Sequence, residues 1–255
     1  YFDFSGYSDM AIGLALLFGI RLPINFNSPY KARNTAEFWR RWHITLSNFL
    51  RDYLYIPLGG NRRGLFRHYM ALMITMFLSG IWHGAGWTFV LWGFQQGLFH
   101  WVYLTWTHVK RRLGITIDNH ATRAVAIGVT FFSWVIGLVL FRAPNLEVGI
   151  EMYKTMFFMS GLDADSIIRH DRAWERIALA ALIVWTCPNT IQIMARVQPV
   201  VEWARVERSV TPAVGWLKRI VWRPNVFTAA GAAILAFYAV LYIGRRTGEF
   251  LYFQF

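Results

Sequence analysis

The sequence predicts an all-α, polytopic integral membrane protein. Of its 255 residues, 56% are hydrophobic and 18% are aromatic, whereas only 16% are charged. Thirteen Trp and eleven Tyr are typical of chains that meet two water–lipid boundaries, where amphipathic rings collect. The apolar residues gather in long runs separated by basic segments, so the net charge of +12 indicates membrane topology and not binding to nucleic acid.

The chain opens with an apolar run over residues 10–20, which is too short to cross hydrocarbon alone because a span takes about 20 residues. Pro23 ends this run. Asn34 and Glu37 form a capping pair that predicts the start of an amphipathic helix over about residues 35–53. We expect this cationic helix to lie in the lipid headgroup plane. Its apolar side chains at helical spacing are Phe38, Trp42, Leu46, Phe49 and Tyr53.

Five apolar segments follow, and each is predicted to be a membrane-spanning helix. They cover residues 69–83, 86–106, 124–141, 177–195 and 226–244. Pro188 and Asn189 interrupt the fourth segment, which predicts a kinked helix there. We expect residues 1–255 to form a single membrane-embedded domain and to be the C-terminal portion of a longer protein, because the first residue is Tyr1 and not Met.

The basic residues of the connecting segments predict the orientation of these spans. Residues 142–176 hold five Lys or Arg against six acidic residues and are expected outside, whereas the basic segments are expected in the cytoplasm. His43 then lies near the inner face and His83 towards the outer leaflet, at opposite mouths of one passage. The basic segments are 31–68, with eight Lys or Arg against two acids, 107–123, with four against one, and 196–224, with six against two.

His83 is the first candidate for chemistry. It lies within a run from Tyr69 to Trp106 that contains no Asp, Glu, Lys or Arg, and an intramembrane histidine indicates a site or a helix–helix hydrogen bond. A neutral imidazole can remove a proton from a hydroxyl group that attacks an acyl carbonyl. Ser79, one turn earlier, is placed to fix the ring. The alternative is that His83 only hydrogen-bonds a neighbouring helix as part of the packing.

His43 is the second candidate, because it follows Arg40 and Arg41 on the interfacial helix. The two guanidinium groups are suited to a phosphate-bearing acyl donor such as a phosphopantetheine arm, with His43 helping to position it. The alternative is contact with anionic lipid headgroups, which residue physics alone favours. No metal site is predicted, since no HxxH or HExxH spacing occurs and the single Cys187 cannot form a cysteine cluster or an internal disulfide.

Five sequence blocks resemble the membrane-bound O-acyltransferase family. They read YFDFSGYSDMAIG (1–13), NFNSPY (25–30), EFWRRWHITLS (37–47), YLYIPLGGNR (53–62) and SGIWHG (79–84). The resemblance implies a helical ring around a transmembrane funnel. It places the catalytic histidine on His83, as general base or acyl relay, and a second, donor-side histidine on His43. The residues expected to bind donor or substrate are Arg40, Arg41, Trp39, Trp82 and Ser79.

The resemblance also implies a function. It predicts transfer of acetyl groups from a cytoplasmic thioester, acetyl-CoA or another phosphopantetheine thioester, to an exported polysaccharide such as alginate, with no bound cofactor. The expected setting is the bacterial inner membrane, with periplasmic acetyl-transfer partners and an N-terminal half of the same protein. The alternatives are D-alanyl or acetyl transfer to teichoic acid, peptidoglycan or cellulose. A proton-coupled transporter subunit, whose histidines relay protons, is the alternative that is not an enzyme.

Overall fold

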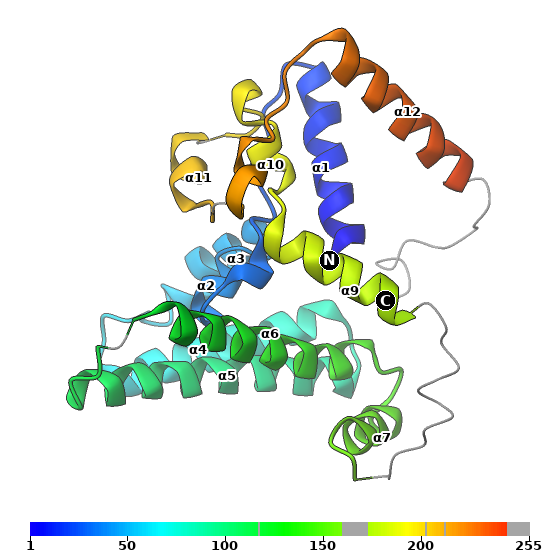
Figure 1. Ribbon diagram of the computed structural model, residues 1–255. Helices are drawn as coiled ribbons and strands as arrows, with labels where there is room; N and C mark the ends of the chain where they lie inside the picture. Colours follow the sequence, from blue (N-terminus) through cyan, green and yellow to red (C-terminus); the bar gives the residue numbers. More distant parts are fainter. Residues whose placement is uncertain (117, 160–172, 202, 212, 244–255) are drawn as a thin grey trace. The chain divides into compact units, whose positions relative to one another are not determined.

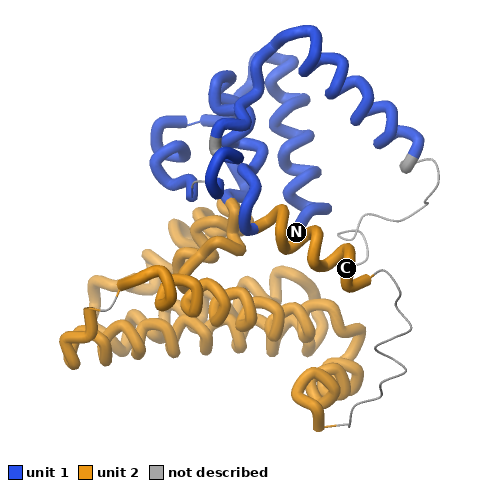
Figure 2. The backbone as a smooth tube through the Cα atoms, in the orientation of Figure 1, with its two compact units in different colours: residues 1–27, 185–255 blue, residues 28–184 orange. Residues whose placement is uncertain are grey.

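Helices make up most of the described part of the chain. The computed structural model describes residues 1–116, 118–159, 173–201, 203–211 and 213–243. Within these residues the only β-type pairing is an isolated bridge between Leu22 and Val200, so the predicted all-α class is confirmed. The chain divides into two compact units, residues 1–27 with 185–255 and residues 28–184 (Figure 2). That all of these residues form one membrane-embedded domain stays a prediction.

The first unit joins the two ends of the chain. The side-chain amide of Asn27 donates to the hydroxyl of Ser209 at 3.0 Å, and Asn189 donates to the side-chain oxygen of Asn27 at 3.2 Å. These bonds connect residues more than 150 positions apart in the sequence. The helices of this unit are α1 (Phe2–Leu17), α10 (Thr190–Ile193), η3 (Ala195–Val197), α11 (Trp203–Ser209), η4 (Gly215–Arg219) and α12 (Val226–Ile243).

The second unit contains the three longest of the described helices, α4, α5 and α6 (Figure 1). Its core is a group of three helices, in which α5 packs against both α4 and α6. The elements of this unit are η1 (Pro29–Lys31), α2 (Thr35–Trp39), α3 (Ile44–Leu50), a π-helical turn η2 (Arg51–Tyr55), α4 (Leu65–His83), α5 (Trp87–Arg112), α6 (His120–Arg142) and α7 (Leu146–Met156). The helix α9 (Ala173–Thr186) begins in this unit and ends in the other.

Two glycines let the backbones of α4 and α5 approach each other closely. A Cβ atom on Gly80 would collide with the carbonyl oxygen of Phe89 and would lie 3.0 Å from the Cα atom of Gly93. A Cβ atom on Gly93 would lie 3.1 Å from the Cα atom of Gly80. Small residues at a helix crossing are typical of membrane helices, where van der Waals packing supplies much of the association energy. The helices α4 and α5 therefore form a tightly packed helical hairpin.

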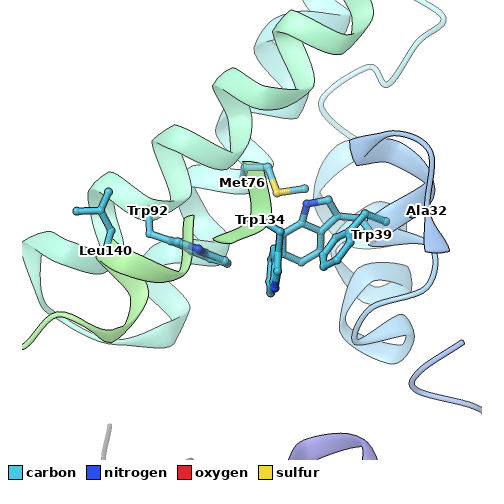
Figure 3. Packing of buried hydrophobic residues seen from close by; sticks show 7 residues of the cluster. Ala32, Trp39, Met76, Trp92, Trp134 and Leu140 are labelled. Atoms are coloured by element: carbon cyan, nitrogen blue, oxygen red, sulfur yellow. The ribbon is translucent and has the colours of Figure 1, made fainter. Parts of the chain in front are cut away.

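An aromatic cluster fills the centre of the second unit. Figure 3 shows side chains of α2, α4, α5 and α6 meeting there. The rings of Phe38 and Trp134 lie 4.3 Å apart between centroids, and Trp39 contacts both Trp92 and Trp134 at 6.0 Å. Aromatic pairs of this kind stabilise a fold by about 0.5–1.5 kcal/mol beyond the area that they bury. The buried members of the cluster are Ala32, Phe38, Trp39, Met76, Trp92, Trp134 and Leu140.

The structure supports some of the five predicted spans better than others. In the described residues, α4 and α6 are long and apolar enough to cross a membrane by length and composition, and they match the predictions at 69–83 and 124–141. The helix α5 includes residues 87–106 of the second predicted span. It is more polar than α4 and α6, and its buried residues include Gln96 and His100. The helix α12 is a shorter apolar helix, and residue 244 of its predicted span lies outside the described residues.

The predicted continuous helix over residues 35–53 is wrong. The structure has α2 as far as Trp39, a break, and α3 from Ile44, followed by the turn η2. His43 adopts a left-handed backbone conformation, with a φ of 43°, and this conformation cannot continue an α-helix. Its carbonyl instead accepts the N–H of Ser47 at 2.9 Å and starts α3. The break therefore sets the direction of α3 and the position of the His43 side chain.

The predicted kinked helix over residues 177–195 is also wrong. The helix α9 stops at Thr186, and a separate short helix, α10, begins at Thr190. Pro188 has no N–H to donate, and it disfavours helical geometry at Cys187 before it. Asn189 then acts as an N-cap, because its side chain accepts the N–H of Gln192 while the Gln192 side chain accepts the N–H of Asn189. This capping box makes a new helix start more favourable than a kink.

Candidate functional site

His83 ends α4 inside a ring of aromatic side chains. Its imidazole lies 4.9 Å from the ring of Trp82 and 4.9 Å from that of Phe141, centroid to centroid. The rings of Trp92 and Phe89 follow at 5.2 and 6.3 Å. The side chain is half-buried, so the imidazole is neither sealed inside the protein nor freely exposed. The setting is apolar on several sides, which is suited to holding one imidazole in a defined orientation.

Trp82 brings the second histidine into the same site. The rings of His43 and Trp82 lie 6.4 Å apart with an interplanar angle of 73°, and Trp82 is also in contact with His83. The two imidazoles lie within electrostatic range of each other. The sequence placed them at opposite mouths of a passage, but the structure gathers both around one exposed indole. The indole of Trp82 is therefore a neighbour of both histidines.

His43 is held by its backbone and by burial. It is the N-cap residue of α3, and its left-handed backbone separates α3 from α2. Burial lowers the pKa of His43 from its ordinary value to about 4, because a charged imidazole loses its hydration in this environment. The ring is consequently neutral at neutral pH, with one nitrogen able to donate a hydrogen bond and the other able to accept one.

The two arginines that precede His43 differ in what they contact. Arg41 donates to Glu37 at 2.8 Å, and both side chains of this pair are largely buried. Arg40 is exposed and makes no ion pair among the described residues. Trp39 is buried in the aromatic cluster, where it contacts Trp92, which in turn contacts His83. Of the two arginines, only Arg40 therefore has an exposed side chain without an ion pair in the described part of the chain.

Ser79 does not orient His83. Its side chain is fully buried, and its hydroxyl has no hydrogen-bond partner among the described residues. The predicted contact fails because the imidazole is positioned by rings from α5 and α6, where the sequence suggested a hydroxyl one turn back on the same helix.

The sequence did not indicate three residues that contact His83. Trp92 and Phe89 come from α5, and Phe141 comes from α6. The glycines around Gly84 could have pointed to Trp92 and Phe89. A chain that reverses after His83 must bring the start of the next helix alongside His83. Phe141 gave no signal, since it is 58 residues away in the sequence and its position depends on the packing of α6.

Two surface pockets lie in the second unit, but His83 lines neither. One of about 430 Å³ lies between the start of α5 and the link from α6 to α7, with Trp87, Thr88, Asn145 and Glu147 in its wall. The other, about 860 Å³, lies along α6 and α7 and is lined by Val139, Glu151 and Met152 among others. In the part of the chain that the structure describes, no three His, Cys, Asp or Glu side chains cluster in a way that suits a metal ion.

The family comparison connects this geometry with known proteins. The profile of the membrane-bound O-acyltransferases matches residues 1–142, which include α2 to α6 and every residue of the site named above. The chain belongs to the membrane-bound O-acyltransferase family. The resemblance predicted from the five sequence blocks is thereby confirmed.

The names of relatives of this O-acyltransferase chain refer to several different polymers. The chain is 39% identical over its whole length to the probable alginate O-acetylase of Pseudomonas putida, of which it covers 51%. It is 48% identical to the peptidoglycan O-acetyltransferase of Helicobacter pylori, over 64% of the chain and 30% of that protein. The teichoic acid D-alanyltransferase of Streptococcus thermophilus is 31% identical over 55% of the chain and 38% of that protein. The chain thus spans about half the length of its relatives or less.

Proposed function

We propose that the protein is an acetyltransferase that moves an acetyl group from a cytoplasmic thioester to a hydroxyl group of an exported polysaccharide, with His83 as the catalytic residue. The observation that carries this proposal is the site around Trp82, where a half-buried His83 and a neutral His43 share one exposed indole. Membership of the O-acyltransferase family supports the reaction class. The alginate O-acetylase relative, which aligns with the entire chain, supports alginate as the acceptor.

In the proposed reaction, His83 acts as general base. The acceptor hydroxyl loses its proton to the imidazole while its oxygen bonds to the acyl carbon, and the carbon–sulfur bond of the thioester then breaks. The proton passes from the imidazolium to the leaving thiolate, so the ring returns to its neutral form. A base of this kind contributes about two to four orders of magnitude in rate. The aromatic side chains around His83 exclude part of the water that would otherwise hydrolyse the thioester.

On the donor side, the proposal assigns acetyl-CoA or another phosphopantetheine thioester to the cytoplasmic face. Arg40 is exposed and offers a guanidinium group to a phosphate, while His43 lies against Trp82. Arg41 supports the same segment through its ion pair with Glu37. These roles place the phosphates near α2 and the acyl group nearer to α4.

The proposed setting is the bacterial inner membrane, crossed several times by the chain. Two described helices have the length and composition of spans, which supports a membrane location. Periplasmic proteins that complete transfer to the polymer, and the segment present in longer relatives, are the proposed partners. Peptidoglycan is a second candidate acceptor, because the Helicobacter pylori relative is 48% identical over 64% of the chain.

The test is the acetyl content of the cell's polymers when His83 is replaced. The variants His83→Ala and His83→Gln should abolish acetylation while the protein still reaches the membrane. His120→Gln is the matched control, because His120 lies exposed at the start of α6 and should leave acetylation unchanged. Normal acetylation by His83→Gln would overturn the proposed mechanism. Acetate released from alginate and from peptidoglycan, measured separately, identifies the acceptor.

A further inference from the structure

Two buried hydrogen-bond donors of α5 have no acceptor among the described residues, and one of them belongs to Trp92, whose ring contacts His83. The indole nitrogen of Trp92 and the side-chain amide nitrogen of Gln96 each lack a hydrogen-bond partner among the described residues. The side chains are 1% and 3% exposed, so water on the surface does not satisfy them. Leaving such a group unpaired costs about 1–3 kcal/mol. Few buried donors remain unpaired in native proteins, and those that do call for a bound water, an ion or a catalytic role.

The two donors converge on one place in the unit. Trp92 and Gln96 are four residues apart on α5 and so lie on the same face of that helix. Both reach the backbone of α6 at Gly137. A Cβ atom built there would collide with the Gln96 amide nitrogen and would lie 3.6 Å from the indole nitrogen of Trp92. The absence of a side chain on Gly137 therefore leaves this place to the two nitrogens.

The same place adjoins the candidate catalytic residue. The ring of Trp92 is in contact with His83 at 5.2 Å, and both rings contact Phe141 of α6, at 5.1 and 4.9 Å. An oxygen atom bound by the indole nitrogen of Trp92 would therefore be held by a side chain that itself contacts the imidazole. This is the arrangement that acyl transfer requires, with a base on one side of the acyl carbon and hydrogen-bond donors on its oxygen.

We propose that Trp92 and Gln96 form a pair of donors that binds the carbonyl oxygen of the acyl group next to His83. The proposal rests on the proposed acyl transfer and adds the group that stabilises its charge. As the acceptor oxygen attacks, the carbonyl double bond opens and its electron pair moves onto the carbonyl oxygen. The two N–H groups stabilise that negative charge until the carbon–sulfur bond breaks and the carbonyl re-forms. Donors fixed in a buried site need little reorganisation for this purpose.

The experiment compares variants that remove one donor and keep the shape of the side chain. Trp92→Phe and Gln96→Leu are introduced into the intact protein, and membrane vesicles are supplied with radiolabelled acetyl-CoA. Each variant should lower kcat by about 100-fold with little change in the KM for acetyl-CoA, as expected for a donor that acts mainly in the transition state. Trp134→Phe is the matched control, since Trp134 belongs to the same cluster but its recorded ring contacts are with α2 and with Trp42, away from His83. It should keep the wild-type kcat.

A third variant displaces a donor without removing it. Gly137→Ala should push the Gln96 amide away at little cost in stability, because the amide is the end of a flexible side chain. It should lower kcat as Gln96→Leu does. Wild-type kcat in all three variants, with or without a loss of thermal stability, would overturn the donor pair and assign the place to a bound water. His83→Gln in the same assay separates the two proposals. If it is inactive while the three variants are normal, only the donor pair fails, and if it is fully active, the proposed function fails.

Discussion

The imidazole of His83 stands perpendicular to the indole of Trp92, with their ring centroids 5.2 Å apart and an interplanar angle of 90°. This contact joins the last residue of α4 to the second turn of α5. It exists because Gly80 and Gly93 let the two helices approach closely and because the chain reverses at Gly84. The packing of two apolar helices thus fixes the orientation of the one ring to which the proposed chemistry is assigned.

Replacing Trp82 tests whether one indole organises both histidines. Trp82→Ala removes the ring that contacts His43 and His83, so both imidazoles lose a neighbour and gain mobility. We expect polymer acetylation to fall at least about tenfold, as when reacting groups lose their alignment. Trp106→Ala is the control, because Trp106 is also exposed but lies on α5, and it should be neutral. Equal activity in the two variants would show that Trp82 has no organising role.

The two arginines should give different kinetic results. Arg40→Ala removes an exposed cation and should raise the KM for acetyl-CoA about tenfold or more, the usual size of a charge-assisted hydrogen bond. Arg41→Ala removes the hydrogen bond to one oxygen of Glu37, whose other oxygen keeps its contacts with Arg33, and should lower the free energy of unfolding by roughly 1–3 kcal/mol. Initial rates over a range of acetyl-CoA concentrations, with thermal melts in detergent, measure the two effects. A raised KM in Arg41→Ala alone would reverse the assignment.

His43 should make stability depend on pH. In the unfolded chain its imidazole binds a proton below about pH 6.5, but in the folded protein the pKa of His43 is about 4. Between these values the unfolded state binds more protons, so the free energy of unfolding falls as the pH is lowered. The loss approaches roughly 3 kcal/mol at the folded pKa. Thermal melts across this range should show a weaker pH dependence in His43→Gln than in the wild type. An identical dependence would contradict the burial of this ring.

Glycine substitutions test the close packing of α4 and α5. Gly80→Ala places a methyl group against the backbone of Phe89, which cannot move as a flexible side chain can. We expect a loss of about 1–3 kcal/mol, the usual cost of overpacking. Gly128→Ala is the control in α6, since no atom lies within 4 Å of its added methyl group, and it should be neutral or stabilising. Thermal melting of the purified variants measures the difference, and equal melting temperatures would refute the close approach.

Part of this structure could be predicted from residue patterns, and part could not. The helices α4 and α6 follow from their apolar runs, and the Asn34–Glu37 pair marked the start of α2 correctly. The break at His43 has no signature in composition, because it depends on a left-handed backbone that histidine rarely adopts. Pro188 correctly predicts an interruption after α9, but proline alone is compatible with a kink or with a new helix, and the capping box of Asn189 with Gln192 decides for the new helix.

The candidate site also contains residues that the sequence predicts and residues that it does not. His83 was predicted from the sequence because a titratable group stands out in an apolar run, and His43 because it follows two arginines; the family resemblance pointed to both and to their flanking tryptophans. Their neighbours Trp92, Phe89 and Phe141 were not predicted, since aromatic residues are common throughout this chain and only tertiary packing selects these three. The roles of His83 and His43 themselves stay predictions until their variants are assayed.

The most direct test of the account is transfer of label across a sealed membrane. Vesicles that carry the intact protein, with the acceptor polymer and the proposed periplasmic partner proteins on the periplasmic face, would be supplied with radiolabelled acetyl-CoA on the cytoplasmic face only. The account predicts that labelled acetyl esters appear on the polymer with the wild-type protein and with His120→Gln, and do not appear with His83→Gln. Labelling of the polymer by His83→Gln at the wild-type rate would contradict it.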